Sequence, residues 1–163
     1  MAGSVPLVYA DACLFVEVLQ KKSATWRDSY KVLGAAERRD IRFVAFRLLA
    51  VEVGRFRADR QRERVDDLVM RYLDAVDTRW VEVDLLISRE ARNLSWEYNI
   101  KSGADAVHLS TAVRQKADYF MSRDGAFPYG ETIGQTRVVY PQVIWEETLF
   151  DEDDLAGDPT VES

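Results

Sequence analysis

Short apolar runs alternate along this chain with longer segments in which apolar residues recur every three or four positions. The short runs have the length and composition of buried strands, and the longer segments have the period of amphipathic helices. We expect strands at Leu7–Ala10, Ile41–Phe46, Trp80–Val83, Tyr119–Met121 and Arg137–Tyr140. We expect helices that start at about residues 12, 23, 49, 65, 86 and 104. Because strands that alternate with helices are joined by parallel crossovers, the pattern predicts an α/β fold, a three-layer α/β/α sandwich with a central parallel sheet.

Length and composition fit one domain. The chain has 163 residues, of which 47% are hydrophobic, enough for a single core without disulfides or structural zinc. Cys13 is the only cysteine and His108 the only histidine, which excludes an internal disulfide and a Cys/His zinc site. We expect a domain over residues 1–150, followed by an acidic, disordered tail over residues 151–163.

The cysteine content and the N-terminal region also predict a compartment. A lone Cys13 is typical of reducing, intracellular surroundings. The first basic residue is Lys21, so the N-terminus lacks the charge of a signal peptide, and no apolar run is long enough to span a membrane. We therefore expect a cytoplasmic protein.

The net charge of −6 is unevenly distributed along the chain. Residues 146–163 hold eight acids and no base, and the remainder carries a net charge of +2. Nine arginines and five acids fall within residues 37–64. This stretch is either a solvated helix face or a phosphate-binding surface, for which Arg55, Arg57 and Arg60 are our candidates.

Several enzyme classes are excluded by missing motifs. The chain has no Gly-x-Ser-x-Gly elbow, no Gly-x-x-x-x-Gly-Lys phosphate loop and no Gly-x-Gly-x-x-Gly fingerprint. A hydrolase triad would have to use His108. We interpret this histidine as a residue that packs or forms hydrogen bonds within its helix.

Two aspartates follow predicted strands. Asp11 comes directly after the first strand, and Asp124 comes two residues after Ser122, just past the fourth. The carboxyl ends of parallel strands line the ligand crevice of such sheets, so both side chains could face a functional edge. The alternatives are a helix N-cap for Asp11 and a cap or turn residue for Asp124.

Two further acids lie on predicted helices. Glu52 is the only charge in the apolar run Leu48–Val53, and Asp105 lies in the first turn of the helix from residue 104. Glu52 could instead face solvent and pair with Arg55, and Asp105 could complement the helix dipole. If the first and fourth strands are neighbours, all four acids lie near one edge of the sheet. Converging carboxylates repel unless a divalent cation neutralises them, which favours Mg²⁺ or Mn²⁺ and phosphodiester hydrolysis.

These acids stand in segments that are similar to those of a known family. The segments are Val8-Tyr9-Ala10-Asp11, Glu52 with its helix, residues 104–112, and residues 117–124 followed by Phe127. The chain resembles the PIN-domain ribonucleases from about Leu7 to Pro141, and most closely the VapC-like toxins of toxin–antitoxin pairs. The blocks around Asp105 and Asp124 are the most specific part of the resemblance.

The resemblance implies a central parallel sheet of order 3-2-1-4-5 and a metal-dependent endoribonuclease. Asp11, Glu52, Asp105 and Asp124 would bind Mg²⁺ or Mn²⁺, and Ser122 would orient Asp124 or the attacking water. The substrate would be RNA. Such toxins form homodimers and are inhibited by an antitoxin protein, often through an arginine that reaches the carboxylates.

The chain also departs from the family pattern. The family has Ser or Thr after the first aspartate and often a small polar residue next, where this chain has Ala12 and Cys13. A hydrogen bond that supports Asp11 is therefore in doubt. Two alternatives stay open: a catalytically silent PIN-like binding module, and a PIN nuclease of RNA processing without an antitoxin.

Overall fold

The computed structural model describes residues 4–54, 67, 70–74 and 77–145. The proposed phosphate surface around Arg55, Arg57 and Arg60 and the acidic tail over residues 151–163 lie outside the described residues. The end of the predicted domain at residue 150 lies outside them too.

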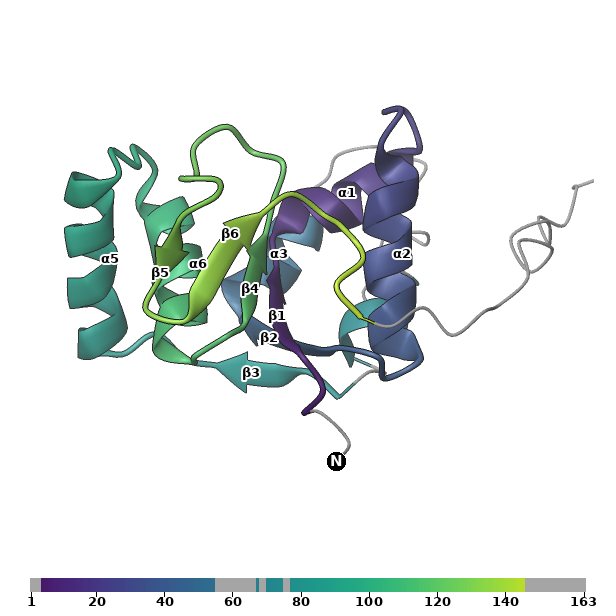
Figure 1. Ribbon diagram of the computed structural model, residues 1–163, viewed down its shortest axis with the longest axis horizontal. Helices are drawn as coiled ribbons and strands as arrows, with labels where there is room; N and C mark the ends of the chain where they lie inside the picture. The colour runs from purple at the N-terminus through teal and green to yellow at the C-terminus, as the bar shows by residue number, and fades with distance from the viewer. Residues whose placement is uncertain (1–3, 55–66, 68–69, 75–76, 146–163) are drawn as a thin grey trace, which may run out of the picture.

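A twisted sheet forms the middle layer of the molecule (Figure 1). The described strands are β1 (Leu7–Ala10), β2 (Arg42–Phe46), β3 (Arg79–Val81), β4 (Tyr119–Met121), β5 (Thr132–Ile133) and β6 (Thr136–Val139). They are arranged in the order β3-β2-β1-β4-β6-β5. All neighbours pair in parallel except β5 and β6, which form an antiparallel hairpin at one edge. The predicted α/β class with a central, mostly parallel sheet is confirmed.

The predicted strand order is confirmed, and the sheet has one additional strand, β5. The strand expected fifth is β6, and it lies beside β4 as predicted. The two-residue β5 was not expected, because it is too short to show a period; a turn with Gly134 at φ 62 joins it to β6. β1 and β4 have the predicted bounds, whereas the other three expected strands are shifted or shortened by one or two residues.

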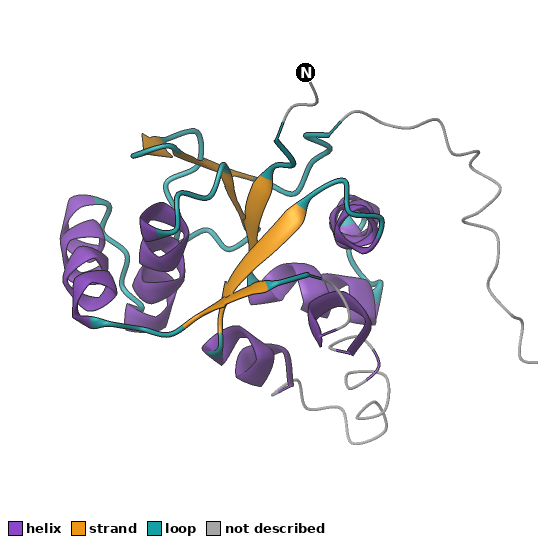
Figure 2. Cartoon of the chain, turned by 90° about the horizontal axis from the view of Figure 1, so that it is seen from below, coloured by secondary structure: helices purple, strands orange, loops and turns teal. Residues whose placement is uncertain are grey.

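Helices cover both faces of the sheet, as Figure 2 shows from below. The described helices are α1 (Ala12–Gln20), α2 (Trp26–Glu37), α3 (Leu48–Gly54), α5 (Leu85–Glu97) and α6 (Gly103–Arg114), with a π-helical turn at Met70–Asp74. Alternate strand residues face the two layers. Val8 and Ala10 pack in one core with α1, α2 and α3, and Tyr9 packs in the other with α5 and α6.

Side-chain caps stabilise the N-termini of α5 and α6. Asp84 accepts a hydrogen bond from the backbone N–H of Ile87 at 2.8 Å, and Ser102 accepts one from that of Asp105 at 3.3 Å. These caps satisfy backbone donors of the first helical turn. The start of α6, with Asp105 in its first turn, is thereby fixed.

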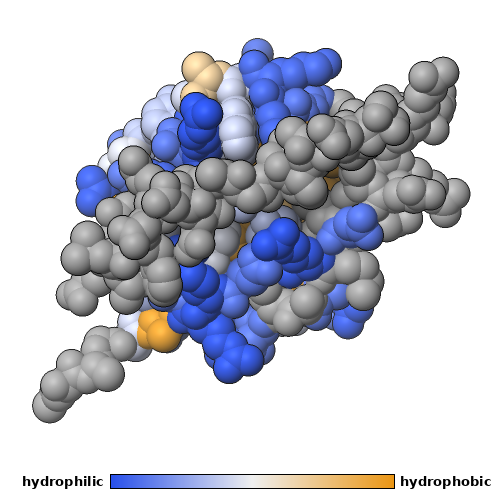
Figure 3. Space-filling model, turned by 90° about the vertical axis from the view of Figure 1, so that its right-hand side faces the viewer, coloured by the Kyte–Doolittle hydropathy of each residue, from blue (hydrophilic) through white to orange (hydrophobic). Residues whose placement is uncertain are grey.

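The described side chains on the α2 side of the molecule are mainly hydrophilic (Figure 3), as the outer face of an amphipathic helix should be. Within the described ranges, no helix combines the length and the apolarity needed to cross a membrane.

Candidate functional site

The carboxyl ends of β1 and β4 lie side by side. Ala10 is in register with Met121, and the backbone N–H of Asp11 donates to the Met121 carbonyl at 3.0 Å. This register places Ser122 next to Asp11, and its hydroxyl donates to the Asp11 carboxylate at 2.8 Å. The two strand ends that carry predicted site residues therefore meet at one edge of the sheet.

The Asp11 carboxylate is buried, and only 7% of the residue is exposed. Asp11 occupies the N-cap position of α1, as the alternative expected, but its side chain makes no capping hydrogen bond. Burial raises the pKa of Asp11, although the charge of His108 and the hydrogen bond from Ser122 act in the opposite direction. The fold thus holds a buried acid whose ionised form is short of stabilising partners.

Cys13 stands where the family pattern often has a small polar residue, and it contacts the Asp11 carboxylate itself. Its sulfur lies 3.5 Å from the Asp11 carboxylate and 3.4 Å from the Ser122 hydroxyl, and it accepts from the backbone N–H of Arg123 at 3.3 Å. Burial raises the pKa of Cys13 to about 12, so the thiol is protonated at neutral pH. Ser122 and Cys13 together hold the Asp11 side chain.

Asp105 faces the same edge from the first turn of α6. Partial burial raises the pKa of Asp105, and the charges of Asp11, Asp124 and Glu52 raise it further, against the effect of His108. Asp105 is therefore within electrostatic reach of the other three acids that the sequence singled out. Asp105 still satisfies the helix-dipole alternative, since it lies in the first turn of its helix.

Asp124 lies in a turn directly after β4. One carboxylate oxygen accepts from the backbone N–H of Ala126 at 3.0 Å, and its own N–H donates to the Ser122 hydroxyl at 3.1 Å. The Tyr129 hydroxyl donates to the Asp124 carbonyl at 2.6 Å. Asp124 is thus a turn residue, as the alternative interpretation expected. Its charge also acts on Asp105. Ser122 bonds the side chain of Asp11 and only the backbone of Asp124.

Glu52 reaches the cluster from α3 and is only 26% exposed. Its carboxylate lies 2.7 Å from His108 Nε2. Glu52 does not simply face solvent, as the alternative expected, because its carboxylate contacts the buried histidine. Arg55, its partner in that alternative, lies outside the described residues.

His108 is the site residue that sequence reasoning missed. It is 1% exposed, and it packs against the rings of Tyr9 and Phe46 as an interior histidine would. Its Nδ1 shares a hydrogen bond with the Tyr9 hydroxyl of β1, and not with a group of its own helix. Its three-residue spacing from Asp105 was the available signal, because residues three apart share one face of a helix.

Nε2 of His108 is poorly satisfied in its buried position. Among the described residues it has no hydrogen-bond partner of good geometry, although the Glu52 oxygen lies 2.7 Å away. A buried ring nitrogen beside two carboxylates fits the edge of a cation site.

Asp11, Glu52 and His108 can offer three ligand atoms within 4.8 Å of one another. Carboxylate oxygens suit Mg²⁺ and Mn²⁺, and an imidazole nitrogen is better matched to the softer Mn²⁺. The residues present therefore fit a divalent cation, with Asp105 and Asp124 adding negative charge nearby.

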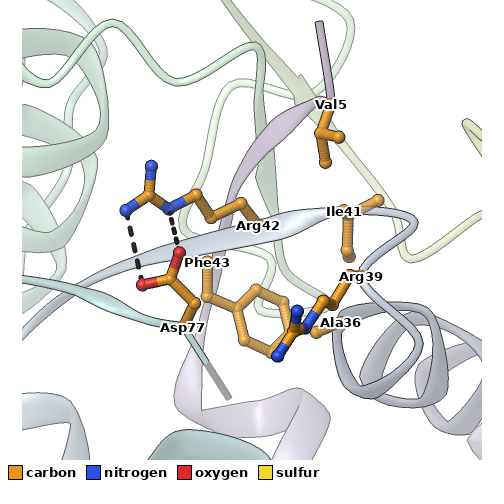
Figure 4. A pocket seen from close by; sticks show the side chains of 7 residues that line it. All are labelled: Val5, Ala36, Arg39, Ile41, Arg42, Phe43 and Asp77. Carbon is orange, nitrogen blue, oxygen red and sulfur yellow. Dashed lines mark hydrogen bonds and ion pairs between the residues drawn. The ribbon is translucent and has the colours of Figure 1, made fainter.

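A hollow of about 510 Å³ adjoins this cluster. It is lined by Asp105, by the connection between α5 and α6, and by the loop over residues 125–128. A second hollow, of about 490 Å³, lies at the opposite edge of the sheet, where β1 and β2 begin (Figure 4). There Arg42 pairs with Asp77 at 3.1 Å, and none of the four predicted acids contributes to the lining.

Comparison of the sequence with models of known protein families finds a match to one family. The sequence model described as PIN domain matches residues 8–129. No curated protein sequence matches the chain.

Two solved structures share the fold. A chain of a toxin–antitoxin complex from Klebsiella pneumoniae superposes with a TM-score of 0.59 at 16% identity, covering 83% of this chain and 99% of that one. A chain of VapBC2 from Rickettsia felis, bound to a DNA fragment from its promoter, superposes with a TM-score of 0.53 at 10% identity, covering 72% and 87%.

Proposed function

Since this chain belongs to the PIN domain family, we propose that it is a metal-dependent endoribonuclease that hydrolyses RNA phosphodiester bonds, and that it is the toxin of a toxin–antitoxin pair. The chain carries the four acids that the family resemblance assigns to metal binding: Asp11, Glu52, Asp105 and Asp124.

The observation that carries this proposal is the convergence of Asp11, Glu52 and His108, whose ligand atoms lie within 4.8 Å of one another. Burial and the charges of Asp11, Asp124 and Glu52 all raise the pKa of Asp105. His108 opposes this effect, and it lies on the same edge as Asp11 and Glu52. Carboxylates gathered in this way are stabilised by a divalent cation.

Asp11 and Glu52 would hold the ion, Mg²⁺ or Mn²⁺, with Asp105 and Asp124 completing the acidic wall. When bound, the ion would act as a Lewis acid that activates the attacking water and stabilises the departing oxygen. Ser122 orients the Asp11 carboxylate through its 2.8 Å hydrogen bond. His108 is hydrogen-bonded to the Tyr9 hydroxyl in the core and places its Nε2 2.7 Å from the Glu52 carboxylate.

The toxin assignment is supported by the fold that the chain shares with the Klebsiella and Rickettsia complexes. We propose an antitoxin protein as partner, a homodimer as the assembled form and the cytoplasm as its compartment. Co-expression with the product of an adjacent gene, followed by light scattering of the purified complex and of the chain alone, tests the partner and the dimer.

Cleavage of a mixed structured RNA tests the enzymatic proposal. Purified protein is incubated with Mg²⁺, with Mn²⁺ and with EDTA, beside the variants Asp11→Asn and Asp105→Asn. We expect metal-dependent cutting that both variants lose. Absence of cutting by folded wild-type protein without a bound inhibitor would favour the catalytically silent binding module. Cutting by a protein that has no antitoxin gene beside its own would favour the RNA-processing nuclease.

A further inference from the structure

We propose that the hollow beside Asp105 binds one nucleobase of single-stranded RNA, on a nucleotide next to the phosphate that is cut. The inference rests on the proposed nuclease function and names the contact that would position its substrate. A volume of about 510 Å³ is large enough for a base with part of its sugar.

The hollow adjoins the acidic cluster through Asp105. Asp105 belongs to both: its carboxylate is within reach of the charges of Asp11, Asp124 and Glu52, and it also lines the hollow. An RNA strand whose phosphate lies at the acids must place a neighbouring nucleotide within a few ångströms of them. The hollow shares Asp105 with these acids, so it is the candidate site for that nucleotide.

The wall from the α5–α6 connection offers the contacts that single-stranded RNA requires. Tyr98 presents a half-buried ring, Asn99 and Ser102 present hydrogen-bonding groups, and Lys101 presents an exposed ammonium. Unstacked bases bind to proteins by stacking on aromatic rings and by hydrogen bonds along their edges, while cations contact the phosphates.

This wall is held in place by local hydrogen bonds. The backbone N–H of Tyr98 donates to the Leu94 carbonyl at 2.9 Å and ends α5. The Ser95 hydroxyl donates to the Ile100 carbonyl at 2.6 Å, and Asn99 turns the chain between them with φ 53, a conformation that asparagine tolerates well.

The opposite wall is equally fixed. Asp124 and Tyr129 tie the ends of the 125–128 loop together through their hydrogen bonds, and the Phe127 ring packs on Phe120 with centroids 4.7 Å apart. A subsite between two preformed walls binds its ligand without a large ordering cost. Gly125 lines this hollow, and an added Cβ there meets no atom within 4 Å.

These features give two complementary variants. Tyr98→Ala removes the stacking ring and leaves space, whereas Gly125→Leu fills space and removes no polar group. Trp96→Ala is the matched control, because this indole lies two residues away on the same segment, is 84% exposed and does not line the hollow.

The test measures binding and cleavage separately. Fluorescence anisotropy with a labelled single-stranded RNA of mixed sequence, in EDTA, gives the affinity without cutting. Initial rates with Mn²⁺ give kcat and KM. We expect Tyr98→Ala and Gly125→Leu each to weaken RNA binding and raise KM about tenfold with little change in kcat, and Trp96→Ala to change neither.

The outcomes separate this inference from the proposed function. RNA binding that depends on Tyr98 and Gly125 without cutting by the wild type would overturn the nuclease and retain the subsite. Cutting by the wild type with unchanged affinity and KM in both hollow variants would overturn the subsite and retain the nuclease. No RNA binding by the folded wild type would overturn the subsite as well.

Discussion

Two acids near opposite ends of helix α1 occupy contrasting environments. Glu17 is 11% exposed at its side chain, and its carboxylate accepts hydrogen bonds from Ser23, Thr25, Ser29 and the Arg123 guanidinium. Burial acts to raise the pKa of Glu17, but these four donors outweigh it and the pKa is lowered. Asp11 accepts from Ser122 and the Cys13 thiol, and its pKa is raised.

The opposite pKa shifts distinguish an acid that stabilises the fold, Glu17, from an acid that is available to bind a ligand, Asp11. The donors around Glu17 satisfy its charge, and they tie the segment between α1 and α2 to the residue that precedes Asp124. Asp11 and Asp105 share their environment with other carboxylates, which costs stability unless a cation is bound. Strain of this kind is typical of functional sites.

The largest loss of stability should follow from removing Glu17 from its hydrogen-bond network. Glu17→Ala leaves the buried Ser29 hydroxyl and the Arg123 guanidinium without their acceptor, so we expect a loss of about 3 kcal/mol in the free energy of unfolding. Urea denaturation measures it.

Glu82→Ala is the control for this loss. Glu82 pairs with Arg47 at 2.5 Å, but the two side chains are 74% and 66% exposed, so removal should cost less than about 1 kcal/mol. Equal losses in the two variants would remove the contrast between a buried network and a surface pair.

The next effect concerns the histidine in the acidic region. His108→Asn removes the nitrogen that lies against Glu52, and we expect Mn²⁺ affinity to fall by roughly 10- to 100-fold, measured by isothermal titration. Tyr9→Phe, which removes the partner of Nδ1 and the acceptor of the Phe46 backbone N–H, should cause a smaller loss. Unchanged affinity in His108→Asn would leave the histidine with a packing role alone.

A third prediction uses the opposite signs of the pKa shifts. The folded pKa of Asp105 lies above its ordinary value of 3.8, so the folded state binds more protons in that window and metal-free stability falls as pH rises through it. Glu17 acts in the opposite sense, because its contribution is present above its ordinary pKa of 4.5 and is lost as pH falls through its lowered folded value.

Asp105→Asn should therefore stabilise the metal-free protein near neutral pH, by about 1 kcal/mol or less because Asp105 is partly solvated. The gain should shrink towards pH 4. Unfolding in EDTA across this pH range measures it. A variant less stable than wild type at pH 7 would show that the cluster does not strain the fold.

The smallest effect is expected at Cys13. Its thiol is protonated and acts through weak contacts with Asp11, Ser122 and the Arg123 backbone N–H, so Cys13→Ser should change kcat/KM by less than about threefold. RNA cleavage by the two proteins at equal metal concentration measures the ratio. A large loss would give the sulfur a role that its geometry does not indicate.

The sequence predicted the parts of this molecule that depend on pattern. Strand alternation predicted the parallel sheet, and the resemblance to the PIN-domain ribonucleases implied its strand order. The acids at strand ends predicted the approach of Asp11 to Asp124 if the first and fourth strands were neighbours. The contact between Glu52 and His108 depends on how α3 meets α6, which no local period encodes. Glu17 was not singled out either, because a glutamate in an amphipathic helix is unremarkable until its four donors converge. β5 is two residues long and carries no period.

Mn²⁺ binding by isothermal titration of wild type, Asp11→Asn and Glu17→Gln tests most directly whether the strained acids form the cation site. We predict binding by wild type, affinity at least about tenfold weaker in Asp11→Asn, and near wild-type affinity in folded Glu17→Gln. No binding by wild type, or equal binding by Asp11→Asn, would contradict this account.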